Sequence, residues 1–411
     1  MAGAQGGQRK QGLWFSRRFL HLGSTGHALG LGLDLARGEN APGVVWRREH
    51  QSRDRAILRA LWFRSSGDSI QSDATVGGRF EVRIVRRHLF PILIAALLLA
   101  FVSSLFIGRF PSPYWMPPTL LQENELARQL VFNLRLPRIL VAVLLGMALA
   151  GAGAVMQMIF RNPLVEPGFL GVSQGAGFGA ALAIITLSNA PLVVEFFAAL
   201  FATLGLALSY LLARHFRYGG SILRLVLAGI AVSALFSAGI GILKFVADPL
   251  KQLPEITFWL LGGLWSVTWN DVTHIAPIVL PALAIIWLMR WRLNLLSLSD
   301  ETAFSLGVSV GRERTLLLAV SVIATAAVVA VAGIVGWIGL IVPHIARRIT
   351  GTDAQYSVPA AMLIGGIFAL VCDDLARAWF AAEIPLGILT SLFGALGFAA
   401  IMLRPASEAH Q

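Results

Sequence analysis

Long apolar stretches with at most one charged residue recur along the chain from about residue 89 to residue 403. Each runs for 18 to 23 residues, long enough for a helix to cross the roughly 30 Å hydrocarbon core of a bilayer. Eight are evident directly: about residues 89–108, 139–160, 168–187, 191–213, 225–243, 272–289, 354–372 and 384–403. The pattern predicts an all-α polytopic membrane protein.

A further apolar block, Thr315 to Ala346, is too long for one ordinary span and short for two. As a helix its 32 residues would measure about 48 Å. Because glycines and Pro343 concentrate in its second half, we expect two helices with a tight turn near Gly333, and ten spans in all. The run Phe258 to Val267 is only about 15 Å long as a helix, so we expect it to be re-entrant or interfacial.

The composition excludes a soluble globular enzyme. Hydrophobic residues make up 56% of the 411 residues and charged residues 13%, whereas about 25% of an ordinary soluble protein is charged. Mean hydropathy is +0.72. The single cysteine, Cys372, excludes an internal disulfide framework and a multi-cysteine metal site, and we expect no metal site.

The net charge of +11 is concentrated at the N-terminus. Residues 1–87 hold 15 Lys and Arg against 7 Asp and Glu, a net charge of +8, whereas residues 88–411 carry only +3. A basic segment before the first span indicates a cytoplasmic N-terminus, so we expect no nucleic-acid partner. We expect residues 1–87 to be a disordered cytoplasmic extension, or untranslated if synthesis starts near Val76 or Val82, and residues 405–411 to be a short cytoplasmic tail.

The loop charges predict the orientation. With ten spans both termini lie on one side, and a cytoplasmic N-terminus places 11 loop arginines inside against 7 lysines and arginines outside. Arg135 and Arg138 lie outside against this trend. They are either snorkelling arginines at a helix start or exposed cations that await an acidic partner.

Glycine recurs at every fourth position at Gly171, Gly175 and Gly179. The three fall on one helix face, and this spacing lets two membrane helices approach closely, so we expect tight helix packing there. The same letters match G-x-S-x-G. That match leaves open an intramembrane serine hydrolase with Ser173 as nucleophile, although no general base with an acidic partner is evident.

Few ionisable residues lie within the predicted spans, which disfavours an ion-coupled secondary transporter, since such proteins bury carboxylates near mid-membrane. Uncharged polar side chains could line a translocation path, although Ser and Thr in membrane helices often bond to carbonyls of their own helix. The candidates for a path are Ser233, Ser237, Thr390 and Ser391.

The sequence contains no P-loop motif of the form G-x-x-x-x-G-K-[ST]. If the protein is ATP-driven, the ATPase is a separate subunit, and the longest internal cytoplasmic loop, Arg290 to Arg314, is the candidate to receive its force. There Ser299 suits the N-cap of a short helix and Gly307 suits its end. Asp300 and Glu301 suit the positive first turn. An ordinary surface helix would look much the same.

Six segments within residues 88–404 share their order and spacing with one family. They are Leu134–Arg138 (LRLPR), Gly153–Gln157 (GAVMQ), Arg161–Ala176 (RNPLVEPGFLGVSQGA), Gly336–Arg347 (GWIGLIVPHIAR), Asp374–Arg377 (DLAR) and Glu383–Thr390 (EIPLGILT). Together they resemble the FecCD-type permeases of ABC importers. That family includes transporters for ferric siderophores, haem and cobalamin, and some for molybdate.

The resemblance implies a multi-pass inner-membrane subunit of ten helices that pairs with a second copy of itself. Two ATPase subunits lie beneath the pair, and a substrate-binding protein docks on the periplasmic side. The chain itself is then no enzyme and binds no cofactor, because the partner ATPase uses ATP and Mg. Transport proceeds by alternating access, with residues 225–243 and 387–403 at the dimer axis.

The resemblance also implies two sites. Arg135, Arg138 and Arg377 match arginines that meet carboxylates of the binding protein. The segment Ser299 to Gly307 matches the coupling helix that contacts the ATPase, with Phe304 and Leu306 in its FSLGV pattern. The usual Ala-Arg of that pattern is Phe304-Ser305 here, a departure at an arginine that contacts the ATPase.

The residues do not separate the substrates of the family. Leu253 to Gly263 resembles a periplasmic segment of iron-chelate and molybdate members. An iron chelate, either a ferric siderophore or haem, therefore ranks first, with cobalamin and molybdate as alternatives. No paired His or suitably placed Tyr supports haem ligation within the channel.

Overall fold

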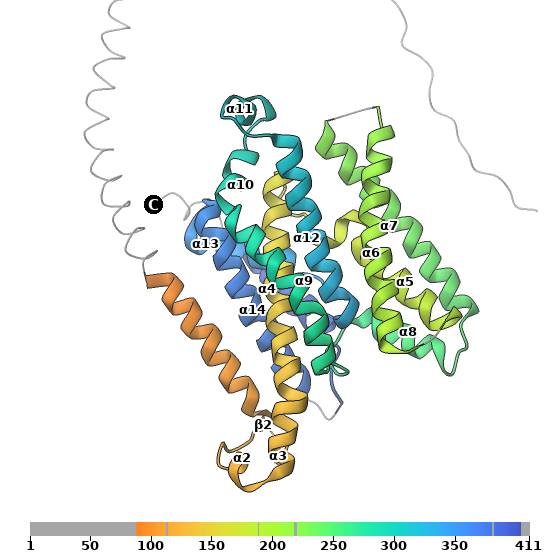
Figure 1. Ribbon diagram of the computed structural model, residues 1–411, viewed down its shortest axis with the longest axis vertical. Coiled ribbons are helices and arrows are strands. Elements are labelled where there is room, and N and C mark those ends of the chain that lie inside the picture. The colour runs from red at the N-terminus through yellow and green to blue at the C-terminus, as the bar shows by residue number, and fades with distance from the viewer. Residues whose placement is uncertain (1–87, 112–113, 188, 218–219, 380–381, 404–411) are drawn as a thin grey trace, which may run out of the picture. The chain divides into compact units, whose positions relative to one another are not determined.

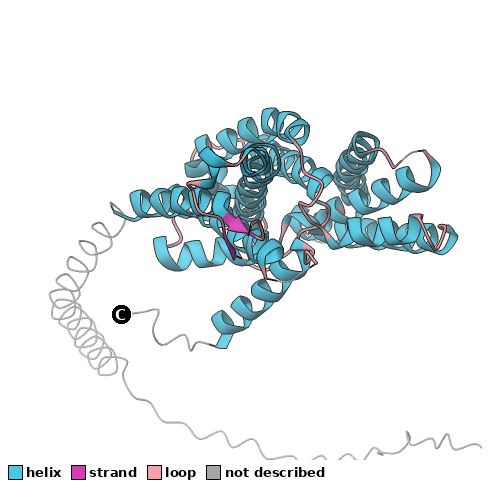
Figure 2. Ribbon diagram, turned by 90° about the horizontal axis from the view of Figure 1, so that it is seen from below, coloured by secondary structure: helices cyan, strands magenta, loops and turns pink. Residues whose placement is uncertain are grey.

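The computed structural model describes residues 88–111, 114–187, 189–217, 220–379 and 382–403. The predictions for residues 1–87 and 405–411 lie outside these residues. The described part is mostly helical, as predicted, with one small pair of strands (Figures 1 and 2).

Within the described residues, seven helices are long and apolar enough to cross a membrane. They are His88–Phe106, the continuous run Glu125–Ile159, α6 (Pro191–His215), α7 (Ser221–Val246), α9 (Trp269–Leu288), α12 (Val310–Ala332) and α14 (Ala354–Ala378). The helices in the remaining expected spans do not meet that criterion: α5 (Val172–Thr186), α13 (Ile338–Thr350) and α15 (Leu386–Leu403). Each expected span thus contains a helix, while the number of membrane crossings, ten, stays a prediction.

The run Glu125–Ile159 is built from three elements: α3 (Glu125–Gln129), the π-helical turn η1 (Leu130–Arg135) and α4 (Leu136–Ile159). The remaining elements are short: β1 (Ile107–Gly108), β2 (Tyr114–Trp115), α2 (Leu120–Glu123), η2 (Pro167–Leu170), α8 (Gln252–Leu261), α10 (Arg290–Leu296) and α11 (Asp300–Ser305). The two strands pair antiparallel, with Ile107 opposite Trp115.

α4 is the central helix of the core and packs against α9, α12, α13 and α14. Most of its side chains are buried, and many of them are Ala or Gly. A Cβ placed on Gly146 would lie 2.0 Å from the carbonyl oxygen of Gly365 in α14. The backbones of α4 and α14 are therefore nearly in contact, an approach that only the smallest residues permit.

The apolar block Thr315 to Ala346 forms two helices, α12 and α13. α12 ends at Ala332 and is followed by Gly333, whose φ is 67°. A Cβ there would lie 2.2 Å from the carbonyl oxygen of Trp259, so both conformation and space require glycine. The predicted turn near Gly333 is confirmed.

Two predicted boundaries are wrong. The run Phe258 to Val267 is not one segment, because α8 ends at Leu261 and Gly262, with φ 69°, follows it. α14 does not end at residue 372 but continues to Ala378, so Asp373, Asp374 and Arg377 lie on a helix long enough to span the membrane. Charges are tolerated at such positions when they pair with one another.

Candidate coupling and docking sites

The loop between α10 and α12 holds α11, which lies at one end of the helix bundle (Figure 1). The side-chain oxygen of Ser299 accepts a hydrogen bond from the backbone N–H of Thr302 at 3.2 Å and so caps the first turn. Asp300 and Glu301 occupy that turn. Gly307 has a φ of 78° just after the helix. The local structure predicted for this segment is thus observed.

Asp300 ties α11 to its neighbours. Its carboxylate lies 2.9 Å from Arg314 of α12 and 3.6 Å from Arg161 in the loop after α4. Hydrogen bonding and charge from Arg314 lower the pKa of Asp300 below its usual range. The ion pairs therefore persist at neutral and mildly acidic pH, and their contribution to stability is lost only as the pH falls through this lowered pKa.

α11 presents apolar side chains outward. Phe304 is 77% exposed and Leu306, directly after the helix, is 56% exposed, whereas Ala303 is buried. An ordinary surface helix places charged or polar residues at such positions. Exposed large apolar residues on a capped and anchored helix are typical of a protein contact surface.

The three arginines expected to dock a partner lie at the other end of the bundle from α11 (Figure 1). Of the two alternatives for Arg135 and Arg138, that of exposed cations is wrong, because both side chains are largely buried. The Arg138 side chain is 11% exposed and pairs with Asp373 at 2.9 Å and with Glu383 at 2.9 Å. Arg377 is buried, bonds to Asp374 and donates to Ser104 Oγ at 2.7 Å. Both guanidinium groups are ion-paired within the chain, Arg138 with carboxylates more than 200 positions away, although the Nε atom of Arg377 has no hydrogen-bond partner among the described residues.

Arg135 is buried as well, at the end of the π-helical turn η1. It donates to the carbonyl oxygen of Leu105 at 2.8 Å, and a Cβ on Gly108 would lie 2.4 Å from its Nη2 atom. The guanidinium thus holds the strand β1 against the helix. Single π-helical turns within α-helices often occur at functional sites.

These arginines nevertheless line a cavity of about 390 Å³. Its charged lining consists of Arg109, Arg135, Arg138, Arg377 and Glu383. Arg138 and Arg377 are paired with carboxylates, so Arg109 and Arg135 are the lining arginines that could attract an anionic group from outside.

Motif segments far apart in the sequence meet beside α4. Gln157 donates from Nε2 to the carbonyl oxygens of Gly339 and Leu340, both at 3.1 Å, and accepts from Arg347 at 2.6 Å. Glu166 accepts from the backbone N–H of Trp337 at 3.3 Å, and its burial raises its pKa. These segments carry the family resemblance, but the sequence assigns no role to them. The structure shows that they hold the broken α12–α13 connection against α4 and η2.

The glycines of α5 lie against α6. A Cβ on Gly175 would lie 2.3 Å from the carbonyl oxygen of Phe201, and one on Gly179 would lie 2.2 Å from that of Phe197. Gly171 precedes α5 with a φ of 80°. This geometry is the close helix approach that the spacing predicts. Because α5 follows a 3₁₀ turn rather than a strand, the elbow needed for a hydrolase nucleophile at Ser173 is not formed.

The four path candidates differ in their surroundings. Thr390 is fully buried and donates to the carbonyl oxygen of Gly387, so in this conformation it does not face a path. Ser237 is exposed on α7, and Ser233 and Ser391 are half-buried on α7 and α15. These three remain predictions.

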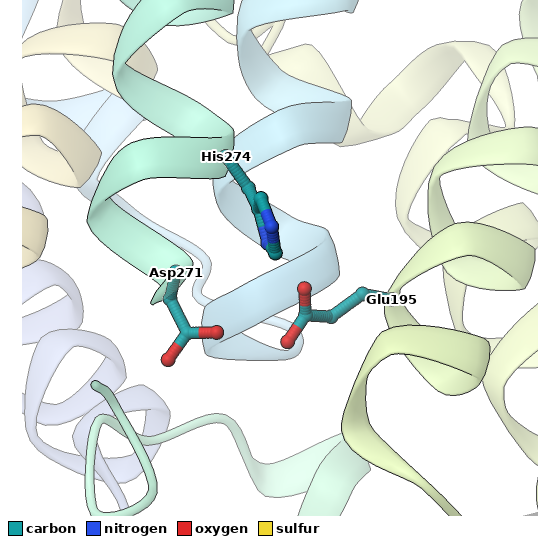
Figure 3. Close-up of side chains that lie close together, drawn as sticks. All are labelled: Glu195, Asp271 and His274. Atoms are coloured by element: carbon teal, nitrogen blue, oxygen red, sulfur yellow. The ribbon is translucent and has the colours of Figure 1, made fainter. Parts of the chain in front are cut away.

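Glu195 of α6 lies beside Asp271 and His274 of α9, with one ligand atom from each within 4.8 Å of the others (Figure 3). Asp271 was not recognised from the sequence, although its i, i+3 spacing from His274 places both on one helix face. Its Oδ2 accepts from the backbone N–H of Thr268 at 2.6 Å and from the Thr268 hydroxyl at 3.0 Å. The Asp271 carboxylate therefore caps the N-terminus of α9.

The sequence matches a known protein family and several of its members. The model of the FecCD transport family matches residues 96–404. The hemin transport system permease protein HmuU of Yersinia pestis is 41% identical over 285 residues, which cover 68% of this chain and 85% of that protein. The molybdate import system permease protein MolB of Haemophilus influenzae is 38% identical over 316 residues, which cover 75% and 93%.

A solved structure agrees. An ABC transporter of metal-chelate type in an inward-facing conformation has a TM-score of 0.71 and 37% identity, covering 77% of this chain and 98% of its own. Together with the apolar helices, these matches make the chain a multi-pass protein of the inner membrane and the permease component of an ABC importer. The chain belongs to the FecCD transport family.

Proposed function

We propose that the chain translocates an iron chelate, a ferric siderophore or haem, across the inner membrane by alternating access. The proposal is supported by the similarity to a hemin permease and to a metal-chelate type transporter. The similarity to a molybdate permease makes molybdate, with cobalamin, the alternative within the same architecture.

We place a second copy of the chain against α7 and α15. Both helices carry large apolar side chains that no described residue covers: Leu227, Ile230, Leu235, Leu392 and Leu396. Two such faces in contact would remove this surface from lipid and leave Ser237 beside the shared axis.

α11 is the element through which two ATPase subunits would act. The exposed Phe304 and Leu306 supply an apolar contact, and the Asp300–Arg314 ion pair joins α11 to α12. A force on α11 would therefore pass directly to a helix whose far end meets the Gly333 turn.

A substrate-binding protein would dock at the basic cavity. A carboxylate of that protein entering the hollow would meet Arg109 at its exposed wall and Arg135 behind it, while Arg138 and Arg377 are already ion-paired within the chain. Partner carboxylates and these arginines form charge-assisted hydrogen bonds.

The substrate assignment is tested by the ATPase activity of the assembled complex of permease, ATPase and binding protein in nanodiscs. The binding protein would be loaded in turn with ferric siderophores, haem, cobalamin or molybdate. We expect stimulation above the unloaded binding protein with an iron chelate. Stimulation by molybdate or cobalamin alone would replace the iron-chelate assignment with that substrate.

Substituting Phe304 by glutamate should uncouple the ATPase, because it replaces the apolar contact with a charge while leaving the Ser299 cap intact. We expect ATP-driven uptake to fall about tenfold, equivalent to about 1.4 kcal/mol of lost contact, with the thermal midpoint of the permease unchanged. Leu250→Glu is the matched control, since Leu250 is 87% exposed in the loop between α7 and α8, outside the helices and away from α11. Equal uptake by the two variants would remove α11 from the coupling role.

A further inference from the structure

A large cavity among the described residues lies near α11, and the function proposed above assigns no ligand to it. Its volume is about 1060 Å³, and it lies between the end of α6, the start of α7 and the start of α12. Figure 1 shows these three helix ends at the same end of the bundle as α11.

The wall of this cavity carries uncompensated positive charge. Its charged residues are Arg214, Arg224, Arg312, Arg314 and Asp300. Four guanidinium groups therefore face one carboxylate. That carboxylate is already engaged by both terminal nitrogens of Arg314, at 2.9 and 3.4 Å.

Two of these arginines keep buried donors without a partner. The Nε atoms of Arg224 and Arg314 are buried and bond to no group among the described residues. Arg224 uses one terminal nitrogen on the carbonyl oxygen of Phe216, at 3.1 Å. Buried polar groups in proteins are nearly always hydrogen-bonded, so unpartnered donors on a cationic wall indicate that an anionic acceptor belongs there.

The remainder of the wall is apolar. It includes Ile159, Phe160, Ile222, Leu225 and Leu318. A site for a small inorganic anion would not need an apolar wall of this kind. A cationic rim above an apolar wall matches a phosphate group attached to a hydrocarbon chain, and basic pockets between membrane helices bind phospholipid headgroups in this way.

We propose that this cavity binds a phosphate group, with an anionic phospholipid as its source and the acyl chain along the apolar wall. The phosphate oxygens accept from the guanidinium groups of Arg224 and Arg314, since guanidinium groups bind phosphate in a forked geometry. Arg214 and Arg312 add charge at the rim. Arg314 also pairs with Asp300, so the phosphate would bind to the same arginine that anchors α11.

The test uses the full-length permease in detergent micelles, titrated with phosphatidylglycerol or with phosphatidylcholine, and read out by native mass spectrometry and by the thermal unfolding midpoint. We expect phosphatidylglycerol to remain bound and to raise the midpoint, while phosphatidylcholine does neither. A third titration with pyrophosphate identifies the source of the phosphate. An equal rise with pyrophosphate would keep the phosphate site but assign it to a soluble ligand.

Variants separate this site from general attraction to a basic surface. Arg314→Gln and Arg224→Gln should each weaken phosphatidylglycerol binding about tenfold. Arg214→Gln, at an exposed position, should weaken it without any risk to folding. Arg348→Gln is the matched control, because Arg348 is exposed at the end of α13 and does not line the cavity. Binding that is equally weakened by Arg348→Gln, or unchanged in all four variants, would overturn the proposal.

Discussion

Replacing Arg138 by alanine is expected to lower the free energy of unfolding by roughly 3–5 kcal/mol, the cost of leaving a buried charge without its partner. Asp373 is fully buried and depends on Arg138 for its two shortest side-chain contacts, at 2.9 and 3.0 Å. Chemical denaturation of the purified protein in detergent micelles, followed by circular dichroism, measures the change.

The matched control is Arg128→Ala. Arg128 also pairs with a glutamate, Glu125, but the two side chains are 57% and 62% exposed. Exposed pairs contribute at most about 1 kcal/mol. Equal losses of stability in Arg128→Ala and Arg138→Ala would contradict the buried network. The same network predicts that charge reversal at Arg138 and Arg377 unfolds the protein.

Gly175→Ala is expected to lower the free energy of unfolding by about 1–3 kcal/mol, the usual cost of forcing an extra group into a packed interior. The added methyl would lie 2.3 Å from the carbonyl oxygen of Phe201, a backbone atom that cannot rotate away. α5 and α6 would have to separate. The thermal midpoint and the denaturation curve of the variant measure the effect.

Gly241→Ala provides the comparison. Gly241 also lies within a long helix, α7, and nothing lies within 4 Å of a Cβ placed there. Alanine favours the helix by about 1 kcal/mol over glycine, so this variant should be neutral or slightly more stable. A loss at Gly241 as large as that at Gly175 would mean that helix packing does not set the requirement for glycine.

Features that depend on neighbouring residues could be predicted from the sequence. The Ser299 cap, the acidic first turn and the positive φ of Gly307 all arise within nine positions, and α11 forms where they indicate. The turn at Gly333 was likewise evident from glycine spacing. Such signals are local because a helix begins and ends through contacts with its own next turn.

Features that depend on folding could not be predicted in this way. Arg138 and Asp373 are separated by 235 positions, and only the packing of α4 against α14 brings them together. The uncharged apolar stretch stops at residue 372, so Asp373 and Asp374 fall outside the span that the sequence predicts. Without these partners, the burial of Arg138 and Arg377 could not be predicted from the sequence. The cavity between α6, α7 and α12 was missed for the same reason, since its arginines come from separate helices.

The most direct test of the importer assignment is uptake into proteoliposomes that contain the permease with its ATPase, with the loaded binding protein outside and ATP inside. We expect substrate to accumulate only when ATP and both partners are present, and to be unaffected by dissipating proton and sodium gradients. Accumulation driven by an ion gradient, without the ATPase, would contradict the assignment and make the chain a secondary transporter.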